Sequence, residues 1–219
     1  MENYHGHREQ FSGDSGPRNG AENINDILGS FMLFFYKTTI DLIVTETNRY
    51  AEQFQNIRDN LFSFRSPVRK WTPVTSSEIY IVMGQFILMS IVQKPTIRSY
   101  FSKRRVISTP GFSDVISRER FEIISRFLHF IDIESLVTYD GPSPPKLSKI
   151  YPLLCHLNSK FQEFYLPKQN IAIDESLTLW KGRLSFAQYI PLKASKFGIK
   201  NRLLVEFHCL HRERDRVCN

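Results

Sequence analysis

The spacing of apolar residues changes once along the chain, and this change constrains the fold more than any other feature. Before Leu166-Pro167 the apolar residues recur at helical spacing, as they do from Ile40 to Ile57. From Ile171 to Leu179 they alternate with polar residues, which is the period of a strand. We therefore expect an α+β fold, in which a helical N-terminal domain is followed by the first strands of a sheet.

The 219 residues are expected to divide into four parts. Residues 1–30 are polar and glycine-rich and are expected to be disordered, whereas residues 31–166 form the helical domain. Residues 167–210 carry strands near 171–180, 184–190 and 203–209, and residues 211–219 are a polar tail. So few strands make an incomplete sheet with an open edge.

Two helix starts are visible in the sequence. Thr75 and Glu78 have the spacing of a capping box, so a helix is expected to begin near Ser76. The run from Ile79 to Val92 is apolar nearly all round and is too short for a membrane span, which favours a buried core helix. Ser117 is expected to cap a later helix.

Asp174 is the candidate for chemistry, because it stands in the middle of the apolar run from Ile171 to Trp180. A desolvated acid usually binds a metal or a cation, and basic residues follow it closely. Strand, acid and cations suggest a metal-dependent phosphodiester site. The alternative is a strand acid that is hydrogen-bonded to the backbone or paired with a lysine.

The chain carries a formal net charge of +7 and a pI of about 9.4, which favours a polyanionic partner, nucleic acid before membrane. Clustered basic residues are candidate phosphate contacts, and such contacts position DNA without reading its sequence. They are Arg69, Lys70, Lys103, Arg104 and Arg105. A solvated basic surface is the alternative.

An ordered series of motifs resembles the piggyBac transposase family, in particular the piggyBac transposable element-derived proteins of animal genomes. The motifs are ETNRYA (46–51), W-x-P-x-T-x-x-E-x-Y (71–80), RFEIISRFLHF (120–130), AIDESL (172–177) and YIPLKASKFGIK (189–200). The resemblance implies that residues 31–166 are a dimerisation and DNA-binding domain. It also implies that residues 167–210 begin an RNase H-like catalytic domain, that DNA and a homodimer are partners, and that the protein is nuclear.

The same resemblance makes Asp174 the first of three catalytic aspartates that bind Mg²⁺ in the intact family, and it places Lys193, Lys196 and Lys200 near the DNA. The other two aspartates are expected beyond residue 219, and Ala194 stands where the family usually has proline. We therefore expect a transposase-derived, truncated protein that binds DNA without a complete catalytic triad and needs no cofactor. A protein-interaction or dimerisation module and a transposon remnant without function are the alternatives.

Overall fold

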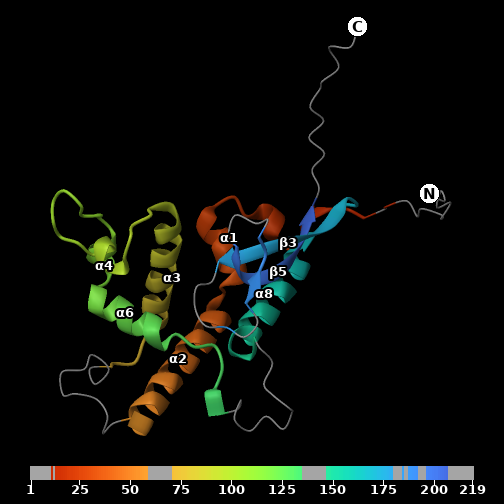
Figure 1. The fold of residues 1–219 in the computed structure, drawn as a ribbon. Helices are drawn as coiled ribbons and strands as arrows, with labels where there is room; N and C mark the ends of the chain where they lie inside the picture. The colour runs from red at the N-terminus through yellow and green to blue at the C-terminus, as the bar shows by residue number, and fades with distance from the viewer. Residues whose placement is uncertain are drawn as a thin grey trace. The chain divides into compact units, whose positions relative to one another are not determined.

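The computed structural model describes residues 11, 13–58, 71–134, 147–179, 184, 187–191 and 196–206 (Figure 1). The chain separates into two compact units. One is Asp26–Ser159, called the helical unit here, and the other combines Met1–Asn25 with Lys160–Asn219 and is called the sheet unit. The sequence predicted a separate N-terminal segment, with the next domains beginning at residues 31 and 167. In the structure, the described part of that segment groups with the strands instead.

The helical unit is built around three helices that pack against one another: α2 (Lys37–Arg58), α3 (Ser76–Ile91) and α6 (Arg118–Phe127). The shorter elements are α1 (Ile27–Phe34), α4 (Ile97–Tyr100), α5 (Phe112–Val115), η4 (Ser148–Ile150) and the first part of α8 (Tyr151–Phe164). Apolar side chains from several of these helices share one core, which includes Ile40, Ile79, Phe112, Phe121 and Ile124.

The helix starts follow the capping chemistry read from the sequence. The backbone N–H of Glu78 donates to Thr75 Oγ1 at 3.3 Å, and the N–H of Thr75 donates to Glu78 Oε2 at 3.1 Å. This confirms the capping box and the start of α3 at Ser76. Ser117 caps α6 in the same way, accepting from the N–H of Arg120 at 3.2 Å.

The segment before α3 is held from both sides. On the α6 side, the guanidinium of Arg120 donates to Glu78 Oε1 at 2.7 Å and Oε2 at 2.9 Å. It also donates to the carbonyls of Thr72 at 2.9 Å and Pro73 at 3.3 Å, and it lies 5.2 Å from the centroid of the Trp71 ring. A planar cation with five donors can satisfy all of these partners at once.

From α2, the side-chain amide of Asn48 pairs with the backbone of Val74 in both directions. The N–H of Val74 donates to Oδ1 at 2.7 Å, and Nδ2 donates to the carbonyl at 3.0 Å. The segment from Trp71 to Thr75 is therefore pinned to α2 and α6 together. Val74 itself is buried in the core.

The C-terminal half of α3 departs from the expected buried helix. Phe86, Ile87, Leu88 and Ile91 are exposed in the described structure, and Ile91 is 74% exposed. Among the described residues no single helix is long and apolar enough to cross a membrane; the bent pair of α1 and α2 passes by length and composition when taken together.

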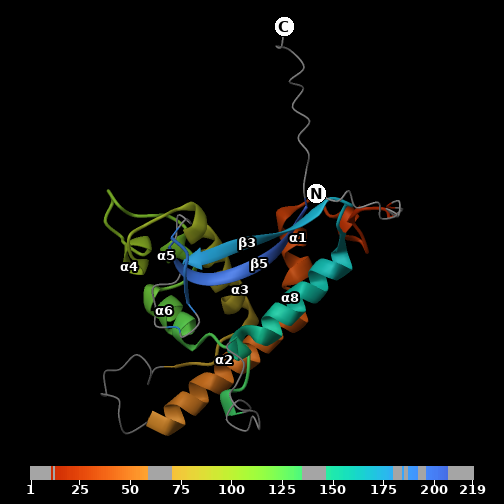
Figure 2. The ribbon, with the colours of Figure 1, turned by 45° about the vertical axis from the view of Figure 1, so that its right-hand side comes forward.

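The sheet unit contains two small antiparallel sheets. β1 (Gly16–Pro17) pairs with β2 (Tyr165–Leu166), and η1 (Ala21–Asn23) follows β1. β3 (Ile171–Leu179), β5 (Phe197–Glu206) and β4 (Gln188–Tyr189) form the second sheet, in that order. Figure 2 shows β3 and β5 side by side. The expected third strand, near 203–209, in fact begins at Phe197. The start of this strand was not predicted, because Lys196 and Lys200 give the segment a basic composition that is typical of a loop.

Gly198 is required where β5 lies between its two neighbours. It stands opposite Leu179 of β3 and Gln188 of β4. A Cβ atom there would lie 2.1 Å from the carbonyl oxygen of Thr178, which is closer than any real contact. A residue with a side chain would therefore push β3 away from β5.

The described part of the N-terminal segment is ordered by α8 and the residues that follow it, although its composition predicts disorder. The backbone N–H of Arg18 donates to the carbonyl of Phe164 at 2.9 Å. Its side chain donates to the carbonyl of Glu163 at 3.1 Å and to that of Gln162, and Asn19 donates to Glu163 as well. The last carbonyls of a helix have no partner within the helix, so a cation with several donors is well suited to them.

We predict that Arg120→Gln destabilises the helical unit by about 2 kcal/mol, because it leaves the partly buried Glu78 carboxylate without its main partner. The free energy of unfolding, from urea denaturation, measures this loss. Arg118→Gln on the same helix is the matched control. Its nitrogens are 4.0 Å from Glu119 and Glu122, so a loss below about 0.5 kcal/mol is expected.

The hydrogen bonds from Arg120 lower the pKa of Glu78 below its ordinary 4.5. Their contribution is therefore complete above pH 4.5 and is lost as the pH falls toward the folded-state pKa. The difference between wild type and Arg120→Gln should narrow in acid. Equal stability of the two proteins at pH 7 would contradict the role given to this contact.

Candidate nucleic-acid interface

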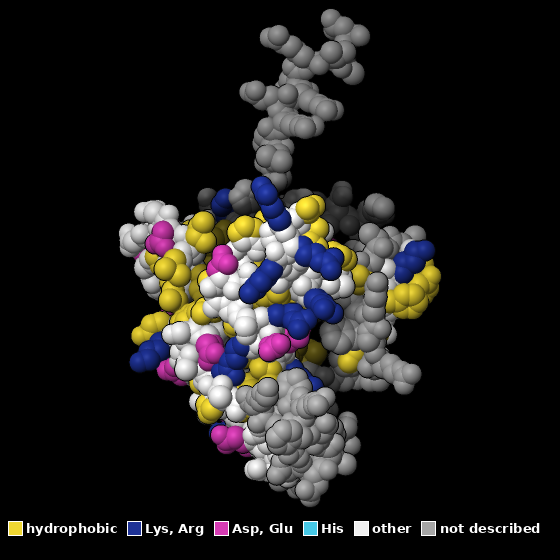
Figure 3. All heavy atoms as spheres, turned by 90° about the vertical axis from the view of Figure 1, so that its left-hand side faces the viewer, with side chains coloured by type: hydrophobic (Ala, Val, Ile, Leu, Met, Phe, Trp, Pro, Cys, Tyr) yellow, Lys and Arg dark blue, Asp and Glu magenta, His cyan; other side chains and the backbone are white. Residues whose placement is uncertain are grey.

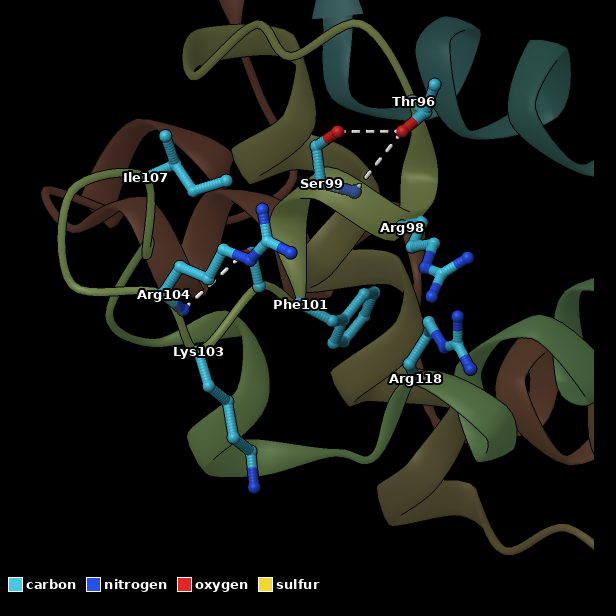
Figure 4. Close-up of a pocket in the computed structure, with 9 residues that line it drawn as sticks. Thr96, Arg98, Ser99, Phe101, Lys103, Arg104, Ile107 and Arg118 are labelled. Carbon is cyan, nitrogen blue, oxygen red and sulfur yellow. Dashed lines mark hydrogen bonds between the residues drawn. The ribbon is translucent and has the colours of Figure 1, made fainter.

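A cavity of about 730 Å³ opens on the helical unit beside α4, and basic residues surround it. Four cations line it, namely Arg98, Lys103, Arg104 and Arg118. The hydroxyl residues Thr96, Ser99 and Ser102 complete the polar lining, with Phe101 and Ile107 as its apolar part (Figure 4). Figure 3 views the molecule from this side, and Lys and Arg side chains gather there.

Two aromatic side chains anchor α4 so that its other residues face outward. Tyr100 is buried with its ring centroid 4.9 Å from that of Phe112, and Phe101 lies 5.4 Å from Phe121 of α6. Thr96 caps the helix, because its Oγ1 accepts from the N–H of Ser99 at 3.3 Å. The apolar core thus fixes the backbone that carries Arg98.

The loop after α4 is tied back by a lysine. Lys94 Nζ donates to the carbonyl of Ser99 at 3.3 Å and to that of Ile107 at 2.5 Å. This ammonium therefore joins α4 to the far end of the loop that carries Lys103 and Arg104. The two sides of the cavity are held together by this contact.

The cations around the cavity have few ion-pair partners. Among the residues that the structure describes, Arg98, Lys103 and Arg104 make no ion pair, and Arg118 has just two long ones. Figure 4 shows the side chains of Arg98 and Arg118 on the same side of Phe101, whereas Lys103 points away from them. Cations that line one cavity without ion-pair partners repel one another, and an anion bound between them would relieve that repulsion.

The structure brings together some of the predicted phosphate contacts. Lys103 and Arg104 line the cavity, and Arg105 is exposed on the same loop. Arg69 and Lys70 lie outside the described residues.

Sequence reasoning missed Arg98 and Arg118. The sequence did hold a signal for Arg118. It directly follows the cap Ser117, and a cation in the first turn opposes the helix dipole, so helix stability does not favour it there.

Asp174 is exposed in the described structure, so the expectation of a desolvated acid is wrong for this strand. Its Oδ1 accepts a hydrogen bond from the N–H of Glu175 at 2.8 Å. Asp174 faces Leu203 across the sheet, whereas Glu175 belongs to the opposite face. Its neighbours in the sheet therefore add no second carboxylate on its side.

Lys200 is already paired, because its Nζ lies 2.5 Å from Glu175 Oε1. Lys196 is exposed, and Lys193 lies outside the described residues. In the part of the chain that the structure describes, no group of three or more His, Cys, Asp or Glu side chains could hold a metal ion. Among the described residues Asp174 thus offers one carboxylate on its face of the sheet, whereas each Mg²⁺ ion needs several oxygen ligands.

Comparison with known proteins identifies the chain's relatives. The profile of the family described as Transposase IS4 matches residues 28–209. Human PiggyBac transposable element-derived protein 2 is 30% identical over 173 residues, covering 79% of this chain and 26% of that protein. Human PiggyBac transposable element-derived protein 5 is 27% identical over 168 residues, covering 77% and 30%. The chain thus spans between a quarter and a third of the length of these relatives.

One solved structure is similar in fold, the cryo-EM structure of a piggyBac transposase synaptic complex with hairpin DNA. The TM-score is 0.70 at 27% sequence identity, and the alignment covers 88% of this chain and 38% of that one. The fold, with helices followed by strands, is therefore that of a transposase-related protein. The chain belongs to the piggyBac-type Transposase IS4 family, and its curated relatives are transposable element-derived proteins.

Proposed function

We propose that this chain binds DNA through the helical unit, with the cation-lined cavity beside α4 contacting backbone phosphates. The observation that carries the proposal is the group formed by Arg98, Lys103 and Arg104, which make no ion pair within the described residues. Phosphate contacts of this kind release counterions from DNA and supply sequence-independent affinity. The similar transposase is itself in a complex with DNA, which supports the proposal.

The lining suits phosphate better than bases. The hydroxyls of Thr96 and Ser99 in the lining are hydrogen-bonded to each other at 2.7 Å, which leaves one O–H to donate to a phosphate beside the arginines. Phe101 is buried against the core and offers no exposed face for a base to stack on. The cavity would therefore hold DNA without selecting its sequence.

We propose further that the chain by itself does not cleave DNA. Mg²⁺ is the cofactor of the intact family, whereas this chain is proposed to need none. We also propose that it acts in the nucleus. Displacement at phosphorus by the two-metal route needs two ions about 4 Å apart. Strand β3, which we propose to be the first strand of an RNase H-like sheet, supplies Asp174 to one face, while Glu175 on the other face is paired with Lys200.

A homodimer is the alternative, in which the helical unit serves as a protein-interaction module. It is favoured by the exposed apolar side chains of α3, among them Ile87 and Ile91, and of α1, where Ile27 is 91% exposed. A monomeric protein rarely leaves apolar side chains grouped on its surface. DNA binding and dimerisation are compatible, so each needs its own test.

We predict that the double variant Arg98→Gln/Arg104→Gln binds a 30-base-pair duplex about tenfold or more weakly at 0.1 M salt. The plot of log affinity against log salt should lose about 2 units of slope, because each lost phosphate contact removes about 0.9. Fluorescence anisotropy measures both. Lys37→Gln/Lys149→Gln removes the same charge from exposed positions elsewhere on the helical unit. Equal weakening in both double variants would show that net charge, and not the cavity, drives binding.

A nicking assay on supercoiled plasmid tests the absence of cleavage. The wild-type chain with Mg²⁺ or Mn²⁺ should leave the plasmid as intact as the isosteric variant Asp174→Asn does, since one carboxylate cannot hold two ions. Metal-dependent nicking that Asp174→Asn abolishes and Glu175→Gln retains would overturn this proposal.

Light scattering after size-exclusion chromatography tests the dimer. If the exposed face of α3 joins two copies, Ile91→Glu should yield a monomer, because it buries a charge in the interface. Val115→Glu adds the same charge to an exposed residue of α5 and should leave the mass unchanged. A wild-type chain that is monomeric at micromolar concentrations would contradict the module.

A further inference from the structure

The loop that follows α4 contains a tight exposed turn from Arg104 to Ser108. The backbone N–H groups of Ile107 and Ser108 both donate to the carbonyl of Arg104, at 3.0 and 2.7 Å. Val106 at the tip is 96% exposed, and Ser108 is exposed as well. The hydroxyl of Ser108 donates to the carbonyl of Arg105 at 3.3 Å. The turn thus presents a serine and two arginines together to solvent.

The sequence around Ser108 has a charge pattern that suits recognition by an enzyme. Arg105 precedes the serine by three residues and Arg104 by four. In the whole sequence, an arginine stands three residues before a serine or threonine at just two places, Thr72 and Ser108. Basophilic protein kinases select substrates by pairing acidic groups with arginines placed in this way.

The neighbouring hydroxyl is a poorer acceptor. Thr109 precedes Pro110, but its Oγ1 is buried and has no hydrogen-bond partner among the described residues. Ser108 can be reached without unfolding the loop, whereas Thr109 cannot. Burial therefore singles out one hydroxyl in this segment.

We propose that Ser108 is a phosphorylation site for a basophilic serine/threonine kinase, and that its phosphate closes the cationic cavity to DNA. Ser108 Oγ attacks the γ-phosphorus of ATP, the bond from that phosphorus to the β-bridging oxygen breaks, and ADP and the hydroxyl proton leave. The second half of the proposal rests on the proposed DNA binding, whereas the first half does not.

The expected effect follows from where the phosphate would lie. It carries a charge of about −1.5 to −2 at pH 7 and has three strong acceptor oxygens. Ser108 belongs to the same hydrogen-bonded turn as Arg104, and Arg104 and Ile107 both line the cavity. The phosphate would pair with the arginines that otherwise contact DNA, and it would repel the DNA backbone.

The experiment uses the full chain, the catalytic domain of a basophilic kinase and Mg-ATP, with the modified residue mapped by mass spectrometry. Ser108 should be the main site, ahead of Thr72. Ser108→Ala should remove it, and Arg105→Gln should slow incorporation about tenfold or more. A main site elsewhere, or none, would overturn the proposal.

Anisotropy on the 30-base-pair duplex then compares the unmodified chain with the chain phosphorylated at Ser108. Affinity at 0.1 M salt should fall about tenfold or more on phosphorylation. Ser108→Glu should weaken binding more than Thr45→Glu, which places the same charge on an exposed residue of α2. Unchanged affinity on phosphorylation would overturn the regulatory half. If the unmodified chain does not bind DNA, both the proposed function and the regulatory half are wrong. The phosphorylation half is then judged by the mapped site alone.

Discussion

The helical unit depends on the hydrogen bonds that the Arg120 guanidinium makes with the segment from Trp71 to Glu78. One guanidinium joins α6 to the first turn of α3 and to the carbonyls that precede it. Asn48 grips the same segment from α2. Because this segment enters α3 between two fixed partners, the three main helices acquire one mutual arrangement. The core side chains then pack around it.

The same arrangement of helices positions the residues that line the cavity. Arg118 lies two residues before Arg120, so the contact that fixes α6 also fixes one wall of the cavity. Phe101, which also lines the cavity, packs against Phe121 of the same helix. The cations therefore project from backbone that the core already positions, and little ordering would remain to oppose the binding of an anion.

Local chemistry could be read from the sequence, whereas long-range pairing could not. The capping box at Thr75 and the cap at Ser117 depend on neighbouring residues, so their prediction succeeded. The Arg120 contact spans 42 residues, and no local pattern announces it. The prediction that Asp174 is desolvated was wrong, because apolar alternation indicates a strand but does not show which face of the strand is covered by other residues. The ion pair of Lys200 could not be read from the sequence either, since its partner Glu175 lies on a different strand.

The contact of Arg18 with the end of α8 bears on how the protein is made. These residues are 145 positions apart, so the N-terminal segment leaves the ribosome long before its partners exist. At about 5–20 residues per second, the wait is roughly 7–30 s. The helical unit is continuous in sequence, and its synthesis takes up almost all of that interval. The sheet unit is assembled from both sides of it, so its N-terminal part must wait for the helical unit to be synthesised.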